Sequence, residues 1–134
     1  MKRNKYLDEL GIPRNKQGIN FAPDKGDKRA KRWKKERKKY GFDSRETWNL
    51  DGLMAQWIYT HLKLYKKCAS GTIDLEHYKF EYDGTTYTES EAIDYITEQL
   101  GSYIKADGWV DKETQKEVSK AFALLGEILP ALWW

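Results

Sequence analysis

A helical repeat of apolar residues in the middle of the chain constrains the fold more than any other feature. Residues recur there at intervals of three and four: Leu50, Leu53, Met54, Trp57, Ile58, His61, Leu62 and Tyr65. This spacing is typical of an amphipathic helix whose apolar stripe packs on a core. Asp43 followed by Glu46 is a variant of the capping box, and Lys66 and Lys67 suit a helix C-terminus. The pattern predicts a central helix over residues 44–67.

A change of period predicts a β-hairpin around residues 77–88. Aromatic residues alternate there with polar ones, at Tyr78, Phe80 and Tyr82. Asp83-Gly84 is a strong two-residue turn signal, and it places Phe80 opposite Tyr87. Because a lone hairpin is marginally stable, we expect these aromatic side chains to pack on the helices. The alternative is a platform on which bases stack.

Two further helices are predicted after the hairpin. Thr88 with Glu91 forms a capping box that opens a helix over residues 89–106. Asp111 begins a last helix over residues 111–129, and Pro130 ends it. The residues expected to face inward are Ile93, Ile96, Leu100, Tyr103 and Ile104 in the first helix, and Val118, Ala121, Phe122, Leu125, Ile128 and Leu129 in the second. The predicted fold class is mainly α, a small helical domain of about four helices with one β-hairpin.

The domain organisation follows from the distribution of turn-forming residues. Glycines and prolines interrupt residues 1–26, which predicts a poorly structured N-terminal arm. The remaining residues, 27–134, are enough for a single helical domain. No apolar run reaches the roughly 18 residues that span a bilayer, and the lone Cys68 fits a reducing compartment. We therefore expect no membrane contact and a cytoplasmic location.

Opposite charges are separated along the sequence. Residues 1–45 hold 16 Lys and Arg against 6 Asp and Glu, a balance of +10, whereas residues 46–134 hold 8 against 15, a balance of −7. The two balances add to the net charge of +3. Nine of the twelve residues from 28 to 39 are Lys or Arg. With Asp27 as a cap and Gly41 as a stop, this segment predicts a basic helix over residues 27–40.

The basic helix is the strongest candidate for a binding site. Clustered cations displace the counterions of phosphate groups, and the release of those counterions drives association. We expect phosphate contacts from Lys28, Arg29, Arg32, Lys35 and Lys39, with Trp33 anchoring the helix or stacking on the ligand. The predicted ligand is a nucleic acid or a nucleotide. Two alternatives stay open: the cations pair with the acidic part of the same chain, or they meet an acidic protein.

Signals for catalysis and for metals are weak. His61, Cys68 and His77 match no familiar zinc spacing, and His61 is expected to be a core or boundary residue with one satisfied nitrogen. No phosphate-binding or nucleophile motif is present. We therefore predict no catalytic residue, no metal, no cofactor and no enzymatic activity, although a hydrolase built on dispersed carboxylates stays open.

The end of the sequence is apolar, and it carries the second candidate site. Trp133 and Trp134 either fold back onto the helices or form an exposed patch for a partner protein or a second copy of the chain. A homo-oligomer is therefore a further expectation.

Two stretches of the chain resemble small uncharacterised bacteriophage and prophage proteins. The first begins at Glu46–Asp51 and continues through Leu62-Lys63, and the second is Leu129–Trp134. Those proteins share a Trp-x-Leu-Asp helix start and a Leu-Trp-Trp tail. The resemblance implies a phage origin, a mostly helical fold and a location in the bacterial host cell, without an established activity. A phage setting adds an alternative function: a host-takeover or anti-defence protein that inhibits a host protein by direct binding or sequesters a nucleotide signal.

Overall fold

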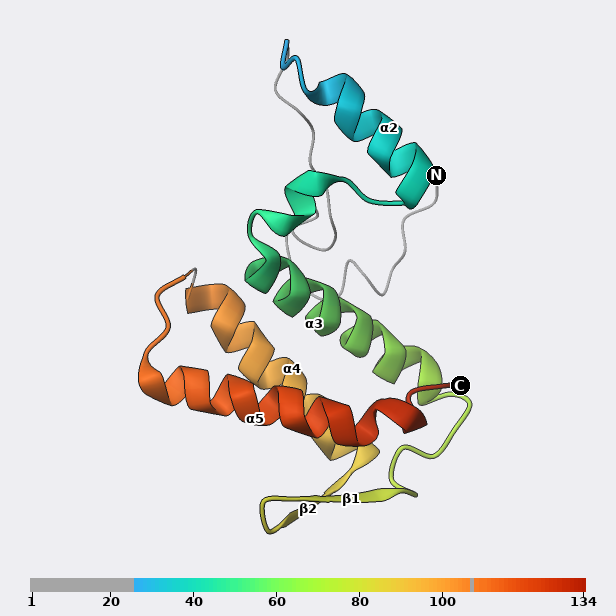
Figure 1. Cartoon of the computed structure of the whole chain (residues 1–134). Helices are drawn as coiled ribbons and strands as arrows, with labels where there is room; N and C mark the ends of the chain where they lie inside the picture. The colour runs from blue at the N-terminus through green and yellow to red at the C-terminus, as the bar shows by residue number, and fades with distance from the viewer. Residues whose placement is uncertain (1–25, 107) are drawn as a thin grey trace.

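The computed structural model describes residues 26–106 and 108–134, so the arm predicted over residues 1–26 lies, apart from Gly26, outside the described residues. The elements in chain order are α2 (Ala30–Tyr40), the 3₁₀ turn η2 (Ser44–Thr47), α3 (Leu50–Ala69), β1 (Lys79–Tyr82), β2 (Thr85–Thr88), α4 (Glu89–Ala106), α5 (Lys112–Ile128) and the 3₁₀ turn η3 (Leu129–Ala131) (Figure 1). This architecture confirms the predicted fold class. None of the described helices has the length and apolar character needed to span a bilayer.

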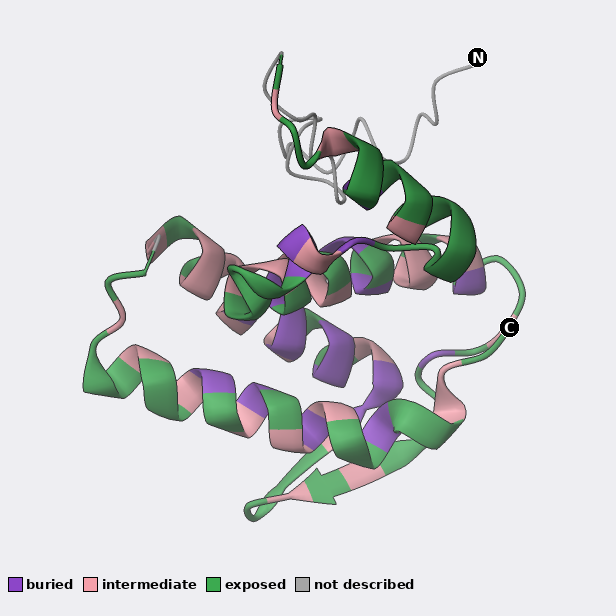
Figure 2. Cartoon of the chain, turned by 45° about the horizontal axis from the view of Figure 1, so that its top comes forward, coloured by how far each residue is buried: buried purple, intermediate pink, exposed green. Residues whose placement is uncertain are grey.

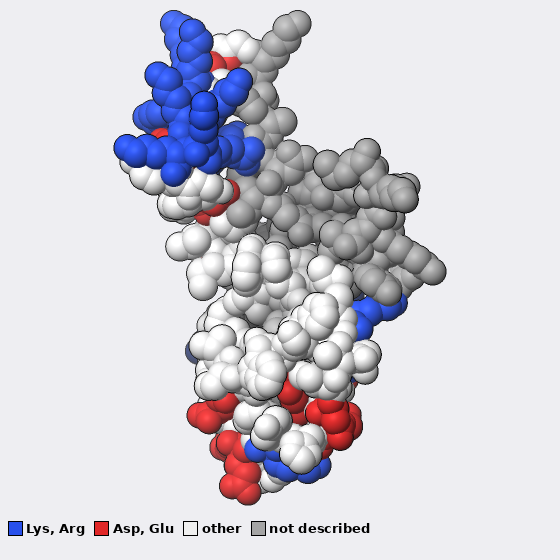
Figure 3. All heavy atoms as spheres, turned by 90° about the vertical axis from the view of Figure 1, so that its right-hand side faces the viewer, with Lys and Arg blue, Asp and Glu red and all other residues white. Residues whose placement is uncertain are grey.

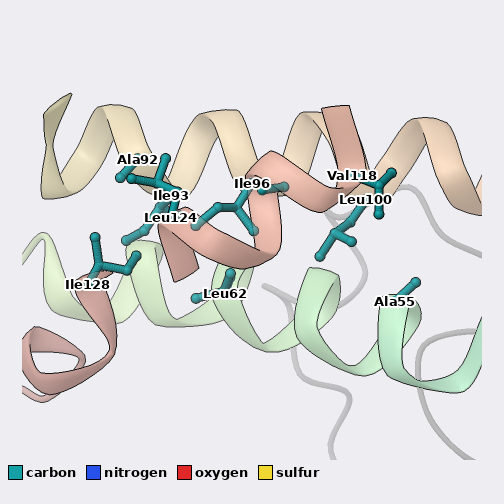
Figure 4. Packing of buried hydrophobic residues seen from close by; sticks show 10 residues of the cluster. Ala55, Leu62, Ala92, Ile93, Ile96, Leu100, Val118, Leu124 and Ile128 are labelled. Carbon is teal, nitrogen blue, oxygen red and sulfur yellow. The ribbon is translucent and has the colours of Figure 1, made fainter. Parts of the chain in front are cut away.

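The core lies between α3, α4 and α5, with α4 packed against both of the other helices (Figure 4). Its buried members are Ala55, Leu62, Ala92, Ile93, Ile96, Leu100, Val118, Ala121, Leu124 and Ile128. The inward face predicted for α4 is confirmed, because Ile93, Ile96 and Leu100 are fully buried and Tyr103 and Ile104 pack at the edge. α2 lies apart from these helices and is exposed along most of its length (Figure 2).

The hairpin has the predicted turn and register. β1 and β2 pair antiparallel with Phe80 opposite Tyr87. Positive φ angles at Asp83 (51°) and Gly84 (74°) are those of a type I′ turn, which matches the twist of the strands. Phe80, Tyr82 and Tyr87 pack against the core, as expected. Tyr78 is exposed, so the expectation that it packs on the helices was wrong.

Two of the three predicted helix caps after residue 40 form as expected. The backbone N–H of Thr88 donates to Glu91 Oε1 at 3.1 Å, and the N–H of Glu91 donates back to Thr88 Oγ1 at 3.1 Å. Asp111 accepts a hydrogen bond from the N–H of Thr114 at 2.7 Å. The third, at Asp43, caps the short turn η2 through the N–H of Arg45. The central helix therefore begins at Leu50 rather than at residue 44.

The exposed side of α3 corrects the sequence prediction. Leu50, Met54, Trp57 and His61 were expected to face the core, but all four are exposed. The core side is formed by Ala55, Ile58, Leu62 and Tyr65. Apolar residues cover more of this helix than one partner can bury, and among the described helices α4 is the one that packs along it. On α5 the predicted Val118, Ala121 and Ile128 are buried, and so is Leu124. The predicted Phe122 and, in η3, Leu129 are exposed, and Leu125 is half-buried.

Candidate anion-binding surface

Trp33 fixes the orientation of the basic helix α2. It is 2% exposed and is the buried residue of α2. The guanidinium carbons of Arg29 and Arg45 lie 4.8 Å and 4.3 Å from its ring centroid, and Trp48 meets it in a T-shaped contact at 5.9 Å. Its indole Nε1 is buried without a hydrogen-bond partner. Of the two predicted roles, the geometry therefore supports anchoring, because a buried ring has no free face for a ligand.

A buried carboxylate ties α2 to η2. Asp43 is fully buried and accepts hydrogen bonds from Arg37 Nε at 2.8 Å and from Arg45 Nε and Nη2 at 3.0 Å and 2.8 Å. The hydrogen bonds from Arg45 hold the pKa of Asp43 below its ordinary value, although burial opposes this shift. Burial, followed by the charge of Asp43, raises the pKa of the neighbouring Glu46. The end of α2 is thus held by charge-assisted hydrogen bonds.

A second carboxylate, on α2 itself, completes this junction. Glu36 accepts a hydrogen bond from the backbone N–H of Ser44 at 2.7 Å. The N–H group at the start of η2 is therefore satisfied by a side chain eight residues earlier in the sequence. This contact and the Asp43 pairs determine which side of α2 faces the protein.

The arginines of α2 and its first turn are engaged with carboxylates of the same chain. Arg29 pairs with Asp27 at 3.1 Å, Arg32 with Glu36 at 3.5 Å, and Arg37 with Asp43 at 2.8 Å. Hydrogen bonds from Arg29 lower the pKa of Asp27. These three partners lie within residues 27–43, so these ion pairs are not the predicted pairing with the acidic part of the chain. Arg29 and Arg32, two of the predicted phosphate contacts, each retain more than half of their side-chain surface in solvent.

The lysines of α2 are arranged differently. Five of them recur at i, i+3, i+4, i+7 and i+8, and we call them the lysine face: Lys31, Lys34, Lys35, Lys38 and Lys39. At 100° per residue this face lies opposite Trp33, and all five side chains are exposed. Within the described chain no carboxylate forms an ion pair with any of them. Figure 3 shows the resulting cluster of positive charge at one end of the molecule, over α2.

The lysine face only partly matches the residues predicted from the sequence. Lys35 and Lys39 belong to it, and Lys28 is exposed just before the helix. Lys31, Lys34 and Lys38 were missed. Spacing could have identified them once Trp33 was taken as the anchor, because they lie across the helix from this tryptophan.

Other candidate residues lie away from α2. Trp133 and Trp134 are 67% and 60% exposed, so their rings do not fold into the core. The tail itself is held by Tyr65, whose hydroxyl donates to the carbonyl of Trp133 at 3.2 Å. His61 is exposed and stacks on Trp57 at 3.8 Å, with Nδ1 2.6 Å from the Trp57 carbonyl oxygen. One of its nitrogens is therefore satisfied as predicted, outside the core.

A groove of about 420 Å³ opens between the first halves of α3 and α5. Its lining includes the apolar residues Met54, Leu100 and Phe122 and the polar residues Asp51 and Tyr103. The hydroxyl of Tyr103 donates to Asp51, which lowers the pKa of Asp51 and raises that of Tyr103. Among the described residues there is no group of three or more His, Cys, Asp and Glu side chains that could hold a metal ion.

Comparison with known proteins adds no relative: no protein-family model, curated protein or solved structure matches this chain. The resemblance to phage proteins therefore stays a prediction.

Proposed function

We propose that this protein is a non-catalytic binding protein whose α2 contacts a phosphate-rich ligand, a nucleic acid or a nucleotide, through the lysine face. One observation carries the proposal: the five lysines share an exposed side of the helix and have no carboxylate partner in the described chain. The arginines beside them do have such partners.

The kind of residue on this face determines the kind of recognition. Arginine binds phosphates and base edges through a planar fork of donors, whereas lysine acts as a hydrated point charge. A surface of lysines therefore attracts phosphates with little demand on their exact geometry. Binding of this type depends on the release of counterions and tolerates different sequences.

The salt dependence of binding tests the proposal. If all five lysines contact phosphates, the plot of log K against log salt concentration has a slope of about −4.5 on duplex DNA, or about −3.5 on a single strand. The triple variant Lys31→Gln, Lys35→Gln, Lys38→Gln should make this slope shallower by about 2 to 3. Fluorescence anisotropy with a labelled oligonucleotide measures both values.

A matched control removes the same charge elsewhere. Lys105→Gln, Lys112→Gln, Lys116→Gln neutralises three exposed lysines outside α2 and should leave the slope close to that of the unmodified protein. Equal losses in the two variants would show that net charge, and not α2, governs binding. An affinity that stays constant over a severalfold increase in salt would overturn the proposal.

A second candidate function is binding to a host protein, as expected for a phage anti-defence or host-takeover protein in the bacterial cytoplasm. The exposed indoles of Trp133 and Trp134 favour it, as do the exposed apolar residues Leu50, Met54 and Trp57 on α3, because contiguous apolar surface often marks an interface. Purification from a bacterial host separates the two functions. A nucleic-acid binder carries material that absorbs at 260 nm, whereas an inhibitor of a host protein is recovered in a stoichiometric, nucleic-acid-free complex.

A further inference from the structure

Exposed aromatic side chains lie at both ends of the basic helix. Tyr40 ends α2 and is 61% exposed, and Phe42 follows two residues later and is half exposed. Trp48, in the segment that leads into α3, is 60% exposed. None of the three belongs to the hydrophobic core or to the residues packed against it. About half or more of the surface of these three residues therefore stays in contact with solvent.

Two of these rings make cation–π contacts with the basic segment. Lys39 Nζ lies 5.2 Å from the ring centroid of Tyr40, and Arg29 Cζ lies 5.6 Å from that of Trp48. Arg29 and Tyr40 are eleven residues apart, which corresponds to about 16 Å along a helix. This separation is longer than a single nucleotide. Tyr40 follows Trp33 by seven residues and Trp48 contacts Trp33, so both rings lie on the anchored side of α2, and Lys39 marks the edge between that side and the lysine face.

We infer that the ligand is a single-stranded nucleic acid whose phosphates pass along the edge of the lysine face at Lys35 and Lys39 while its bases stack on Tyr40 and Trp48. This inference rests on the proposed function and narrows it. Proteins that bind single strands combine a cationic track for the backbone with aromatic rings for the bases. In a duplex the faces of the bases are covered by their neighbours, so exposed rings gain nothing from them unless the stack is opened.

The same geometry indicates weak preference for sequence. Arginine is among the side chains that most often read base edges, and Arg29, Arg32 and Arg37 already pair with carboxylates. Every base has a face on which an aromatic ring can stack, whatever its hydrogen-bonding edge. We therefore expect the protein to prefer single strands over duplexes and to discriminate little between base sequences.

Three probes of equal length test the inference: oligo(dT), an abasic phosphodiester strand and a duplex. The unmodified protein should bind oligo(dT) more tightly than either of the other two. Tyr40→Leu with Trp48→Leu should weaken binding to oligo(dT) by roughly tenfold or more for the pair and leave binding to the abasic strand unchanged. The control Tyr78→Leu with Trp109→Leu, which removes two exposed rings far along the sequence, should change neither.

Because Trp48 also contacts Trp33, a conservative variant separates stacking from folding. Trp48→Phe keeps a ring and should retain most of the affinity that Trp48→Leu loses, while circular dichroism shows both variants folded. An oligo(U) probe distinguishes RNA from DNA: tighter binding than oligo(dT) identifies single-stranded RNA, and weaker binding identifies single-stranded DNA.

The possible failures are distinguishable. Equal, salt-dependent binding of the unmodified protein to oligo(dT) and to the abasic strand would overturn stacking and leave the proposed function intact. Tighter binding to the duplex would also overturn the inference. If none of the probes showed salt-dependent binding, both the inference and the proposed function would be overturned.

Discussion

Arginine and lysine have different roles in the basic segment, although they count equally in its charge. Arg37 and Arg45 donate to the buried carboxylate of Asp43, and Arg45 also lies over the ring of Trp33. A guanidinium suits both contacts because it is planar, weakly hydrated and rich in directed donors. Lysine ammonium groups are strongly hydrated and stay in solvent. The arginines therefore build the junction, and the lysines form the surface.

The buried carboxylate of Asp43 leads to a prediction at this scale. Asp43→Asn removes the carboxylate to which Arg45, which is 5% exposed, donates two side-chain hydrogen bonds. Breaking a buried ion pair costs about 3 kcal/mol or more, so we expect α2 to detach from η2 and its amide hydrogens to exchange faster. Asp27→Asn, at the more exposed pair with Arg29, is the control and should have little effect.

The pH dependence of the same contact provides an independent check. The pKa of Asp43 is lowered from its ordinary value of 3.8, so its stabilising effect is complete above that value and is lost as the pH falls through the folded-state pKa. Protection of the α2 amides should thus hold at pH 5 and decline in stronger acid. In Asp43→Asn this titration should disappear. An unchanged acid transition in the variant would show that Asp43 does not hold α2.

At the scale of elements, the sequence predicted what is determined locally. The Thr88–Glu91 capping box, the Asp83-Gly84 turn and the cap at Asp111 depend on residues within a few positions of one another. The break between η2 and α3 depends on tertiary contacts with α2 instead. The backbone N–H of Ser44, at the start of η2, donates to Glu36 of α2, and Arg37 of α2 donates to Asp43. Local propensity favoured one continuous helix, and these tertiary contacts overrode it.

The same reasoning explains the errors in predicting which side of a helix is buried. Apolar residues cover two sides of α3, and the position of α4 decides that Leu62 is buried and Trp57 is not. On α2 the lysine face is defined only once Trp33 is known to be the anchor. Charge alone does not distinguish Lys31, Lys34 and Lys38 from the other cations, because nine of the twelve residues from 28 to 39 are positively charged.

The capping box of α4 supports a prediction about this element. Thr88 is buried and joins the hairpin to the helix through two reciprocal hydrogen bonds. Thr88→Ala removes the hydroxyl acceptor, and we expect the free energy of unfolding to fall by about 1 kcal/mol. Thr86→Ala, at an exposed position on the same strand, is the control for β propensity. Urea denaturation measures both, and an equal loss in the two variants would contradict a role for the cap.

At the scale of the whole molecule, the core and the basic surface are separate in space. The core is enclosed by α3, α4 and α5, whereas α2 is joined through η2. In the view of Figure 3 the acidic residues gather mostly toward the end opposite α2. This separation explains why carboxylates that outnumber cations in residues 46–134 leave the lysine face unpaired. A cationic end of this kind raises the rate of encounter with a polyanion.

A cluster of cations without carboxylate partners among the described residues should also lower the stability of the helix that carries it. Within the lysine face five pairs of like charge stand three or four residues apart: 31 with 34, 31 with 35, 34 with 38, 35 with 38, and 35 with 39. Each such pair destabilises a helix by about 0.2 to 0.5 kcal/mol. The variant Lys31→Gln, Lys35→Gln, Lys38→Gln removes every one of these pairs, and glutamine has nearly the helix propensity of lysine.

We therefore expect the variant that loses polyanion binding to be more stable than the unmodified protein. Its Tm should rise, and its α2 amides should exchange more slowly. The gain should be largest at low ionic strength and should shrink near 1 M salt, where the Debye length falls to about 3 Å. The control Lys105→Gln, Lys112→Gln, Lys116→Gln should show no comparable gain. A lower Tm in the first variant would mean that these lysines stabilise the fold, and it would contradict their being kept for a ligand.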